Sequence, residues 1–270
     1  MKTVLRYVQM AGAFLNVNVK KGLEYPAYLI GWIFSNLFQF VFGIATVWVV
    51  VSKFQPLDGW GFEQMAFLYG LGIISHGFAI VLFIQTWYMG YFVTEGEFDR
   101  MLVRPLNVFF QFCFINFNFI GFTDLIPGVI IFVFGCISVN FNISFSNILN
   151  LLLAVIGATT IRGGIYTTVG AISFWTQRTD SISRVTGTLL EYSNKYPITI
   201  YPKIIQLLFT VLIPIGFISF YPSAELLTVE TGFSLPGNLC VWTFFVGIVV
   251  YTVGILVFNM GLRRYESSGS

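Results

Sequence analysis

Long runs of uncharged, mostly apolar residues are the dominant pattern along this chain of 270 residues. The run between Glu24 and Lys53 and the run between Glu63 and Glu95 both exceed the ~20 residues that a helix needs to cross a bilayer. A stretch rich in Asn and Ser at 140–147 divides a later run into two helices. The pattern predicts six spans, near 27–51, 64–89, 108–138, 147–174, 204–221 and 239–260.

The residues before the first span carry a different pattern. Apolar side chains recur there at helical spacing, at Val4, Val8, Ala11 and Leu15, and a basic pair follows them. This indicates an amphipathic helix over residues 1–24 that lies on the membrane surface, and a merely solvated tail is the alternative.

The composition agrees with a membrane location. Hydrophobic residues make up 56% of the chain and charged residues only 10%, against the ~25% usual in soluble domains. A net charge of +2 gives no strong basic field, which argues against nucleic-acid binding. We therefore expect one all-α transmembrane domain over residues 1–270.

The basic residues fix the expected orientation. Six spans place both termini on one side, and the side with more Lys and Arg in short loops is the cytoplasmic one. The predicted spans leave only Lys53 on one side and assign twelve basic residues to the other: Lys2, Arg6, Lys20, Lys21, Arg100, Arg104, Arg178, Arg184, Lys195, Lys203, Arg263 and Arg264. Both termini are thus expected in the cytoplasm.

The motifs of several enzyme classes are missing from the sequence. It contains no phosphate-binding loop, no two-histidine zinc motif and no Gly-x-Ser-x-Gly elbow, so we expect no catalytic residue, no metal site and no cofactor in this chain. The single histidine, His76, lies in the second predicted span, where hydrogen-bonded packing is favoured over a proton-relay role.

Two stretches resemble a known family. The segment 94–106 contains Gly96, Asp99, Leu102 and Arg104-Pro105-Leu106, and the C-terminus contains Gly261-Leu262, Tyr265 and Glu266-Ser267. Together they resemble type-2 permeases of ATP-binding-cassette (ABC) exporters, in a poorly characterised branch that shares both motifs.

The resemblance implies partners for the chain. It implies ATPase subunits that bind ATP and Mg on the cytoplasmic side, a second permease subunit that is either a related chain or another copy, and a location in the bacterial cell membrane. The implied function is export of a hydrophobic or amphipathic compound such as a drug, an antimicrobial peptide or a lipid-like molecule. An ATP-independent carrier or channel, or a structural membrane subunit, is the alternative.

The segment between the second and third spans is the candidate docking surface for the ATPase. It is short, and we expect a small helix with an acidic first turn, an apolar face and a proline that ends it. The residues expected to carry docking are Glu95, Glu97, Phe98, Asp99, Arg100, Leu102, Arg104 and Pro105. A solvated loop whose arginines only set orientation is the alternative.

Two charged residues lie inside predicted spans. Asp124 and Arg162 are equally distant from the loop that joins their helices, so they can lie at one depth. An unpaired Arg at the bilayer centre costs about 2.5 to 3.5 kcal/mol on insertion scales, so we expect the two to pair or to face a polar cavity. Snorkelling of Arg162 and local bonding of Asp124 is the alternative.

Overall fold

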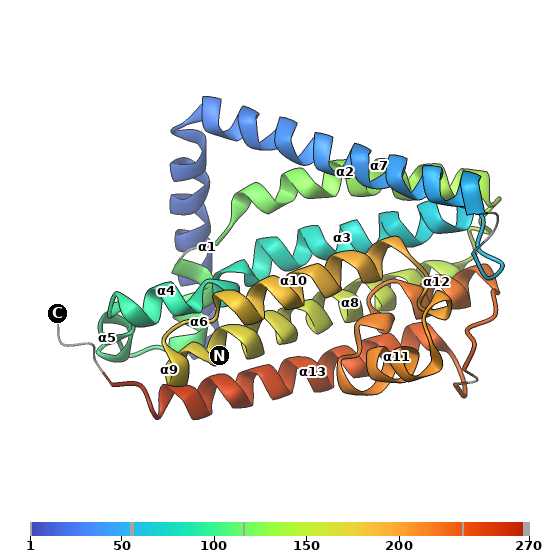
Figure 1. Ribbon diagram of the computed structural model, residues 1–270. Helices are drawn as coiled ribbons and strands as arrows, with labels where there is room; N and C mark the ends of the chain where they lie inside the picture. The colour runs from blue at the N-terminus through green and yellow to red at the C-terminus, as the bar shows by residue number, and fades with distance from the viewer. Residues whose placement is uncertain (1, 55–56, 116, 234, 267–270) are drawn as a thin grey trace.

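The computed structural model describes residues 2–54, 57–115, 117–233 and 235–266, and within these ranges the regular structure is helical, with no strand. Helices that run along most of the molecule are α2 (Pro26–Phe54), α3 (Phe62–Trp87), α8 (Phe145–Ala171) and α13 (Leu239–Leu262) (Figure 1). In the described part of the chain, these are the 4 helices long and apolar enough to cross a membrane. They confirm helices at the predicted ranges 27–51, 64–89, 147–174 and 239–260.

The predicted N-terminal helix is also present. Helix α1 (Lys2–Leu23) runs crosswise to the long helices and joins α2 at a sharp turn (Figure 1). Its half-buried side chains recur at helical spacing, at Ala11, Phe14, Leu15, Asn18 and Val19. The side chains of residues 2–8, which include the predicted apolar positions Val4 and Val8, lie outside the described part. The described stripe packs against the region where α6 ends.

The predicted continuous helix at 108–138 is wrong. The structure divides it into α6 (Val108–Ile115), a short 3₁₀ turn η1 (Phe119–Gly121) and α7 (Phe122–Ser138). The Asn18 side chain of α1 donates to the carbonyl oxygens of Phe114 and Ile115, at 3.3 and 3.1 Å. These carbonyls at the end of α6 have no partner within the helix, so a side chain from α1 supplies one.

The predicted continuous helix at 204–221 is wrong as well. This segment consists of α11 (Lys203–Leu207), a π-helical turn η3 (Leu208–Leu212), a 3₁₀ turn η4 (Ile215–Phe217) and the start of α12 (Phe220–Leu227). Pro214 lies at the break, where its missing N–H and its fixed φ end the helix. The ammonium of Lys203 donates to the carbonyl of Gly232 at 3.1 Å, so the segment enters and leaves the bundle at the same end.

Helix α10 (Asp180–Lys195) takes the lengthwise course instead. It begins beside α4 (Met89–Thr94), runs along α3 and ends where Asn194 approaches Gly72 (Figure 1). Lys195 and Lys203 therefore lie toward the opposite end of the bundle from Arg184, not on its side as the sequence pattern assigned them. The mistake arose because α10 carries charged residues, while the broken segment is apolar.

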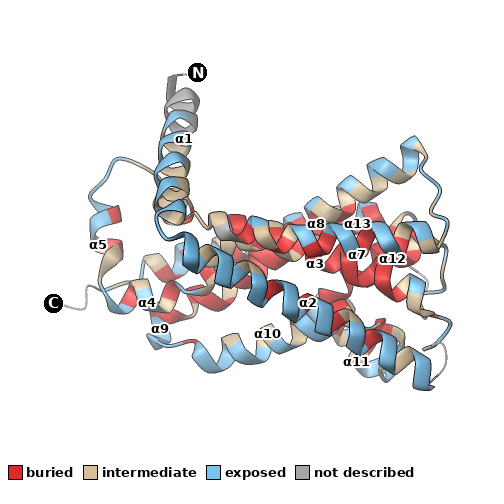
Figure 2. Ribbon diagram, turned by 90° about the horizontal axis from the view of Figure 1, so that it is seen from above, coloured by how far each residue is buried: buried red, intermediate tan, exposed pale blue. Residues whose placement is uncertain are grey.

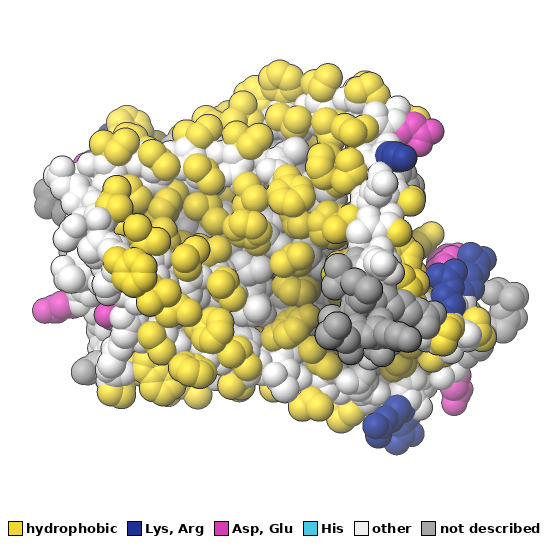
Figure 3. All heavy atoms as spheres, turned by 180° about the vertical axis from the view of Figure 1, so that it is seen from behind, with side chains coloured by type: hydrophobic (Ala, Val, Ile, Leu, Met, Phe, Trp, Pro, Cys, Tyr) yellow, Lys and Arg dark blue, Asp and Glu magenta, His cyan; other side chains and the backbone are white. Residues whose placement is uncertain are grey.

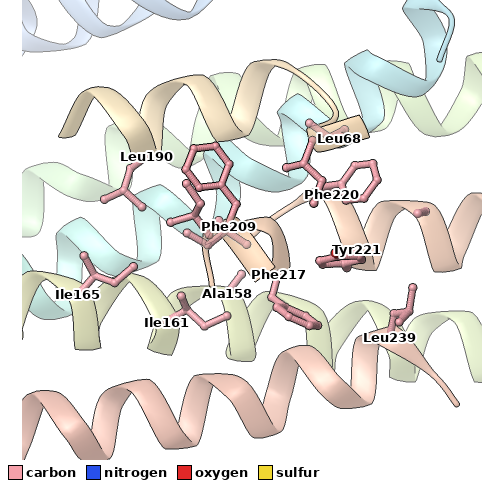
Figure 4. Close-up of a cluster of buried hydrophobic side chains, with 14 of the residues drawn as sticks. Leu68, Ala158, Ile161, Ile165, Leu190, Phe209, Phe217, Phe220, Tyr221 and Leu239 are labelled. Atoms are coloured by element: carbon pink, nitrogen blue, oxygen red, sulfur yellow. The ribbon is translucent and has the colours of Figure 1, made fainter. Parts of the chain in front are cut away.

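Residues 203–227, called here the re-entrant segment, are buried only in part. Its second half, from Ile215 onward, is mostly buried, whereas Ile204, Val211 and Leu212 in the first half are more than 70% exposed. A hydrophobic cluster includes four aromatic residues of this segment together with side chains from α3, α8, α10 and α13 (Figure 4). The four are Phe209, Phe217, Phe220 and Tyr221. The remaining labelled members are Leu68, Ala158, Ile161, Ile165, Leu190 and Leu239. Irregular backbone at membrane depth is tolerated only where protein or a water-filled cavity surrounds it, and this cluster encloses the second half of the segment.

The outer surface of the bundle is largely apolar. Helix α2 buries a single stripe, at Asn36, Phe40, Gly43 and Val47, and exposes most of its other side chains (Figure 2). On the face drawn in Figure 3, hydrophobic side chains cover the middle, while charged groups lie toward the ends. Such a surface requires lipid or another protein as its neighbour.

Glycines allow the closest contacts between helices. A Cβ added to Gly164 would lie 2.6 Å from the backbone of Val250, and one added to Gly157 would lie 2.5 Å from the carbonyl of Thr243. Helices α8 and α13 therefore touch backbone to backbone, the type of packing that small residues permit in membranes.

This contact makes Gly164→Val a test of the bundle. The added side chain cannot fit without separating α8 from α13, so we expect a loss of about 1 to 3 kcal/mol in the free energy of unfolding. Gly31→Val in α2 is the matched control, because a Cβ there meets nothing within 4 Å. Thermal unfolding in detergent measures both, and equal midpoints would contradict the close contact.

Candidate functional sites

The candidate docking segment is a short helix held between two turns. Gly96, with φ of 67°, adopts the left-handed conformation that glycine accepts most easily, and α5 (Glu97–Leu102) follows it. Glu97 and Asp99 lie in the first turn of α5, and Pro105 follows its end. The predicted short helix with an acidic first turn is confirmed.

Phe98 does not have its expected role. Its side chain is 0% exposed, and its ring lies 5.1 Å from the rings of both Phe112 and Phe174, 6.2 Å from that of Phe258 and 5.7 Å from that of Tyr265, measured between centroids. The prediction that Phe98 is an exposed apolar contact for a partner is therefore wrong, because the ring is buried within its own chain. Phe98 instead anchors α5 to the ends of α6, α9 (Ser173–Thr176) and α13.

The outward surface of the segment is made by other residues. Leu102 is 48% exposed and Val103, which the sequence analysis did not select, is 83% exposed. The remaining exposed side chains are Glu95, Arg100, Arg104 and Pro105, while Glu97 and Asp99 are half-buried. An apolar pair flanked by two arginines thus faces away from the bundle.

The structure brings the two motif stretches together. Tyr265, from the C-terminal motif, packs on Phe98 of the docking segment and on Phe174, at centroid distances of 5.7 and 6.0 Å. Burial, and after it the nearby Asp99, raise the pKa of Tyr265 to about 12. Ser267, the last residue of that motif, lies outside the described residues.

The second candidate site is a set of polar groups inside the bundle. Arg162 of α8 is 1% exposed, and its guanidinium donates to Ser75 Oγ at 3.2 Å, to the carbonyl of Gly72 at 3.5 Å and to Asn194 Oδ1 at 2.7 Å. All three acceptors are neutral. Arg162 therefore connects α3, α8 and α10.

Asp124 has different partners. Its carboxylate accepts hydrogen bonds from Asn36 of α2 and from Thr123, and Oδ2 lies 3.9 Å from His76 Nε2. The other ring nitrogen of His76 lies 3.4 Å from the hydroxyl of Tyr166, one turn beyond Arg162 on α8. Among the described residues, Asp124 and Arg162 form no direct ion pair.

The outcome for this pair is thus divided. The predicted ion pair between Asp124 and Arg162 is not formed among the described residues. The other predicted arrangement, in which these charges face a polar cavity, agrees with the structure for Arg162. A cavity of about 300 Å³ lies between α2, α3, α8 and α10 and is lined by Arg162, Tyr166, His76 and Asn194 among others. Sequence reasoning missed Asn194 because α10 was not recognised as a lengthwise helix.

A second cavity is mainly apolar. Its volume is about 570 Å³, and it lies between α8, α10, α13 and the re-entrant segment. Its lining includes Val169, Leu189, Pro214, Phe245 and Val249. The polar cavity and this apolar cavity lie on two sides of α10, and both include Leu190 in their lining.

These features define a multi-pass, helical membrane protein. A family model described as "ABC-2 family transporter protein" matches residues 21–269, so the chain belongs to the ABC-2 family of transporter permeases. This confirms the predicted membership of the ABC-2 family. Searches among curated proteins and among solved structures found no match.

The position of Phe98 leads to a stability prediction. Phe98→Ala removes a ring that four aromatic neighbours surround, and we expect a loss of about 3 to 5 kcal/mol in the free energy of unfolding. Val103→Ala, at an exposed position of the same segment, should change it by less than about 0.5 kcal/mol. Thermal unfolding of the two purified variants decides, and a Phe98 variant as stable as the Val103 variant would show that the ring is not an anchor.

Proposed function

We propose that this chain is the permease subunit of an ATP-driven exporter of a hydrophobic or amphipathic compound in the bacterial cell membrane. Membership of the ABC-2 family supports a permease, and the surface of α5 supports coupling to a separate ATPase. The ATPase subunits would bind ATP and Mg, and a second permease, either a related chain or another copy, would complete the path.

The single observation that carries the proposal is the construction of the docking segment. Its inner face is fixed to the bundle by Phe98, while Leu102 and Val103 project outward between Arg100 and Arg104. A segment anchored at its base and apolar at its tip suits a surface on which a partner docks, because buried apolar contacts supply affinity and flanking charges fix the register. Movement of the ATPase would pass through Phe98 to α6 and α13.

The arrangement of helices supports six crossings with both termini in the cytoplasm. The crossings would be α2, α3, α7, α8, α10 and α13. The docking segment and the basic residues Arg104, Arg178 and Arg264 belong to the end of the bundle near α4, α5 and α9, which agrees with the excess of positive charge expected inside. Helix α1, crosswise to the bundle, would lie along the cytoplasmic membrane surface (Figure 1).

Val103→Asp tests the docking surface. The substitution places a charge on the exposed tip without touching the anchor or any Lys or Arg, so membrane insertion should be unchanged. We expect the variant to lose co-purification of the ATPase, by roughly tenfold or more, together with substrate-stimulated ATP hydrolysis, since charges are depleted from the cores of interfaces.

The matched control is Phe145→Asp, which places the same charge on an 85% exposed aromatic residue at the start of α8, far from α5. It should keep its ATPase. Retention of the partner by the Val103 variant would remove the docking proposal, and absence of any ATPase partner from the unmodified protein would favour an ATP-independent carrier or channel.

Lys203→Cys tests the membrane arrangement, in a chain with the half-buried Cys136 replaced by Ser. Because Lys203 bonds to Gly232 in the loop before α13, an impermeant thiol reagent should label this position from outside the cell. Val103→Cys should be labelled only after the membrane is opened. Labelling of position 203 from the cytoplasm alone would restore the span at 204–221 and contradict the re-entrant course.

A further inference from the structure

The polar cavity contains Arg162, which forms no ion pair with any residue that the structure describes. The guanidinium of Arg162 is 1% exposed, and its hydrogen bonds end on a hydroxyl, a backbone carbonyl and a side-chain amide. Within the described part of the chain, the ion pairs involve Asp124, Glu97 and Glu191, and none of them includes Arg162. These neutral acceptors bind N–H groups on Nε and Nη2 but leave the charge unbalanced in a medium of low dielectric constant.

The carboxylates of the region do not balance this charge. Glu191 lines the cavity, but its Oε1 lies 2.6 Å from the ammonium of Lys195, so the pair is neutral. Asp124 lies behind His76 and accepts from Asn36, and it is not part of the cavity lining. The cavity therefore carries a surplus of about one positive charge.

The other lining groups of the cavity include both hydrogen-bond donors and apolar side chains, which suits an anionic group attached to a hydrocarbon chain. Tyr69 and Tyr166 bring phenolic hydroxyls, which can donate hydrogen bonds, to the same space as Arg162. Phe40, Ile80 and Ile84 supply an apolar wall. A volume of about 300 Å³ accommodates a headgroup and the first part of a chain rather than a whole amphipathic molecule.

We propose that this cavity binds the anionic group, a carboxylate or a phosphate, of the transported molecule, with Arg162 as its counter-ion. The inference rests on the proposed function and narrows its substrate class to anionic amphiphiles. Arginine suits this role because its planar guanidinium forms charge-assisted hydrogen bonds to both anions.

Direct binding tests the inference. The full-length chain, in a non-ionic maltoside detergent, is titrated with radiolabelled dodecyl phosphate, and dodecanoate, dodecanol, dodecyltrimethylammonium and inorganic phosphate are used as competitors. We expect saturable binding that dodecanoate displaces and that the alcohol and the cation do not. Displacement by inorganic phosphate at similar concentrations would assign the site to free anions, whereas weak displacement would assign it to anionic amphiphiles.

Asn194→Asp is the decisive variant. It is nearly isosteric, and it places a carboxylate where the Asn194 oxygen now lies, 2.7 Å from the guanidinium. The fold should be kept, because the new charge pairs with Arg162, while affinity for dodecyl phosphate should fall about tenfold or more because the counter-ion position is filled. Arg162→Lys should keep most of the binding and Arg162→Gln should lose it.

Arg184→Gln is the matched control, because Arg184 lies on α10 as Asn194 does but outside this cavity, and this variant should bind as the unmodified protein does. Equal binding of dodecanol and dodecyl phosphate, or unchanged affinity in Asn194→Asp, would overturn the inference. Co-purification of the ATPase is scored separately, so failure of the anion site leaves the permease proposal standing.

Discussion

Satisfaction of backbone polar groups and charges within the protein is the constraint on which this structure depends. In a hydrocarbon environment no water is available to them, so each interruption of a helix requires a partner from another part of the chain. At the end of α6 that partner is Asn18 of α1. Within the re-entrant segment, Gln206 donates to the carbonyls of Thr199 and Tyr201 at 3.1 and 2.8 Å.

The same constraint explains how charged residues are distributed. Charges at the end near α5 remain accessible and are available for a partner, as with Arg100 and Arg104. Charges inside the bundle are held by neutral or distant groups, as with Arg162 and Asp124. Ionisable groups buried in a membrane are costly, which is why we propose a functional role for Arg162. The polar cavity holds the charge of Arg162 inside the bundle, whereas the docking segment presents the charges of Arg100 and Arg104 on the surface.

The aromatic cluster around Phe98 brings the docking segment into contact with the C-terminal motif. Phe98 and Tyr265 are far apart in the chain, yet their rings pack at 5.7 Å, with Phe174 and Phe258 beside them. Phe98 lies in the docking segment and Tyr265 follows α13. A force applied to α5 would therefore act on α13 through these packed rings. Tight packing transmits small displacements because it leaves no space to absorb them.

The sequence by itself determined the membrane location, the family and the long helices. Uninterrupted apolar runs such as 27–51 and 239–260 leave a helix as the only way to satisfy the backbone, so length and composition were enough. The sequence also indicated a short helix before Pro105, because turn and breaker residues act locally.

Only the tertiary structure decided which segments cross the bundle lengthwise. The segment 204–221 is more apolar than α10, but the enclosure of Phe209 and Phe220 by four other helices is not encoded in hydropathy. Likewise, whether Phe98 faces a partner or its own chain, and whether Arg162 meets Asp124 or Asn194, depends on contacts between residues distant in sequence. A periodic pattern shows that a side chain has an apolar face to bury, but it does not identify the neighbour that buries it.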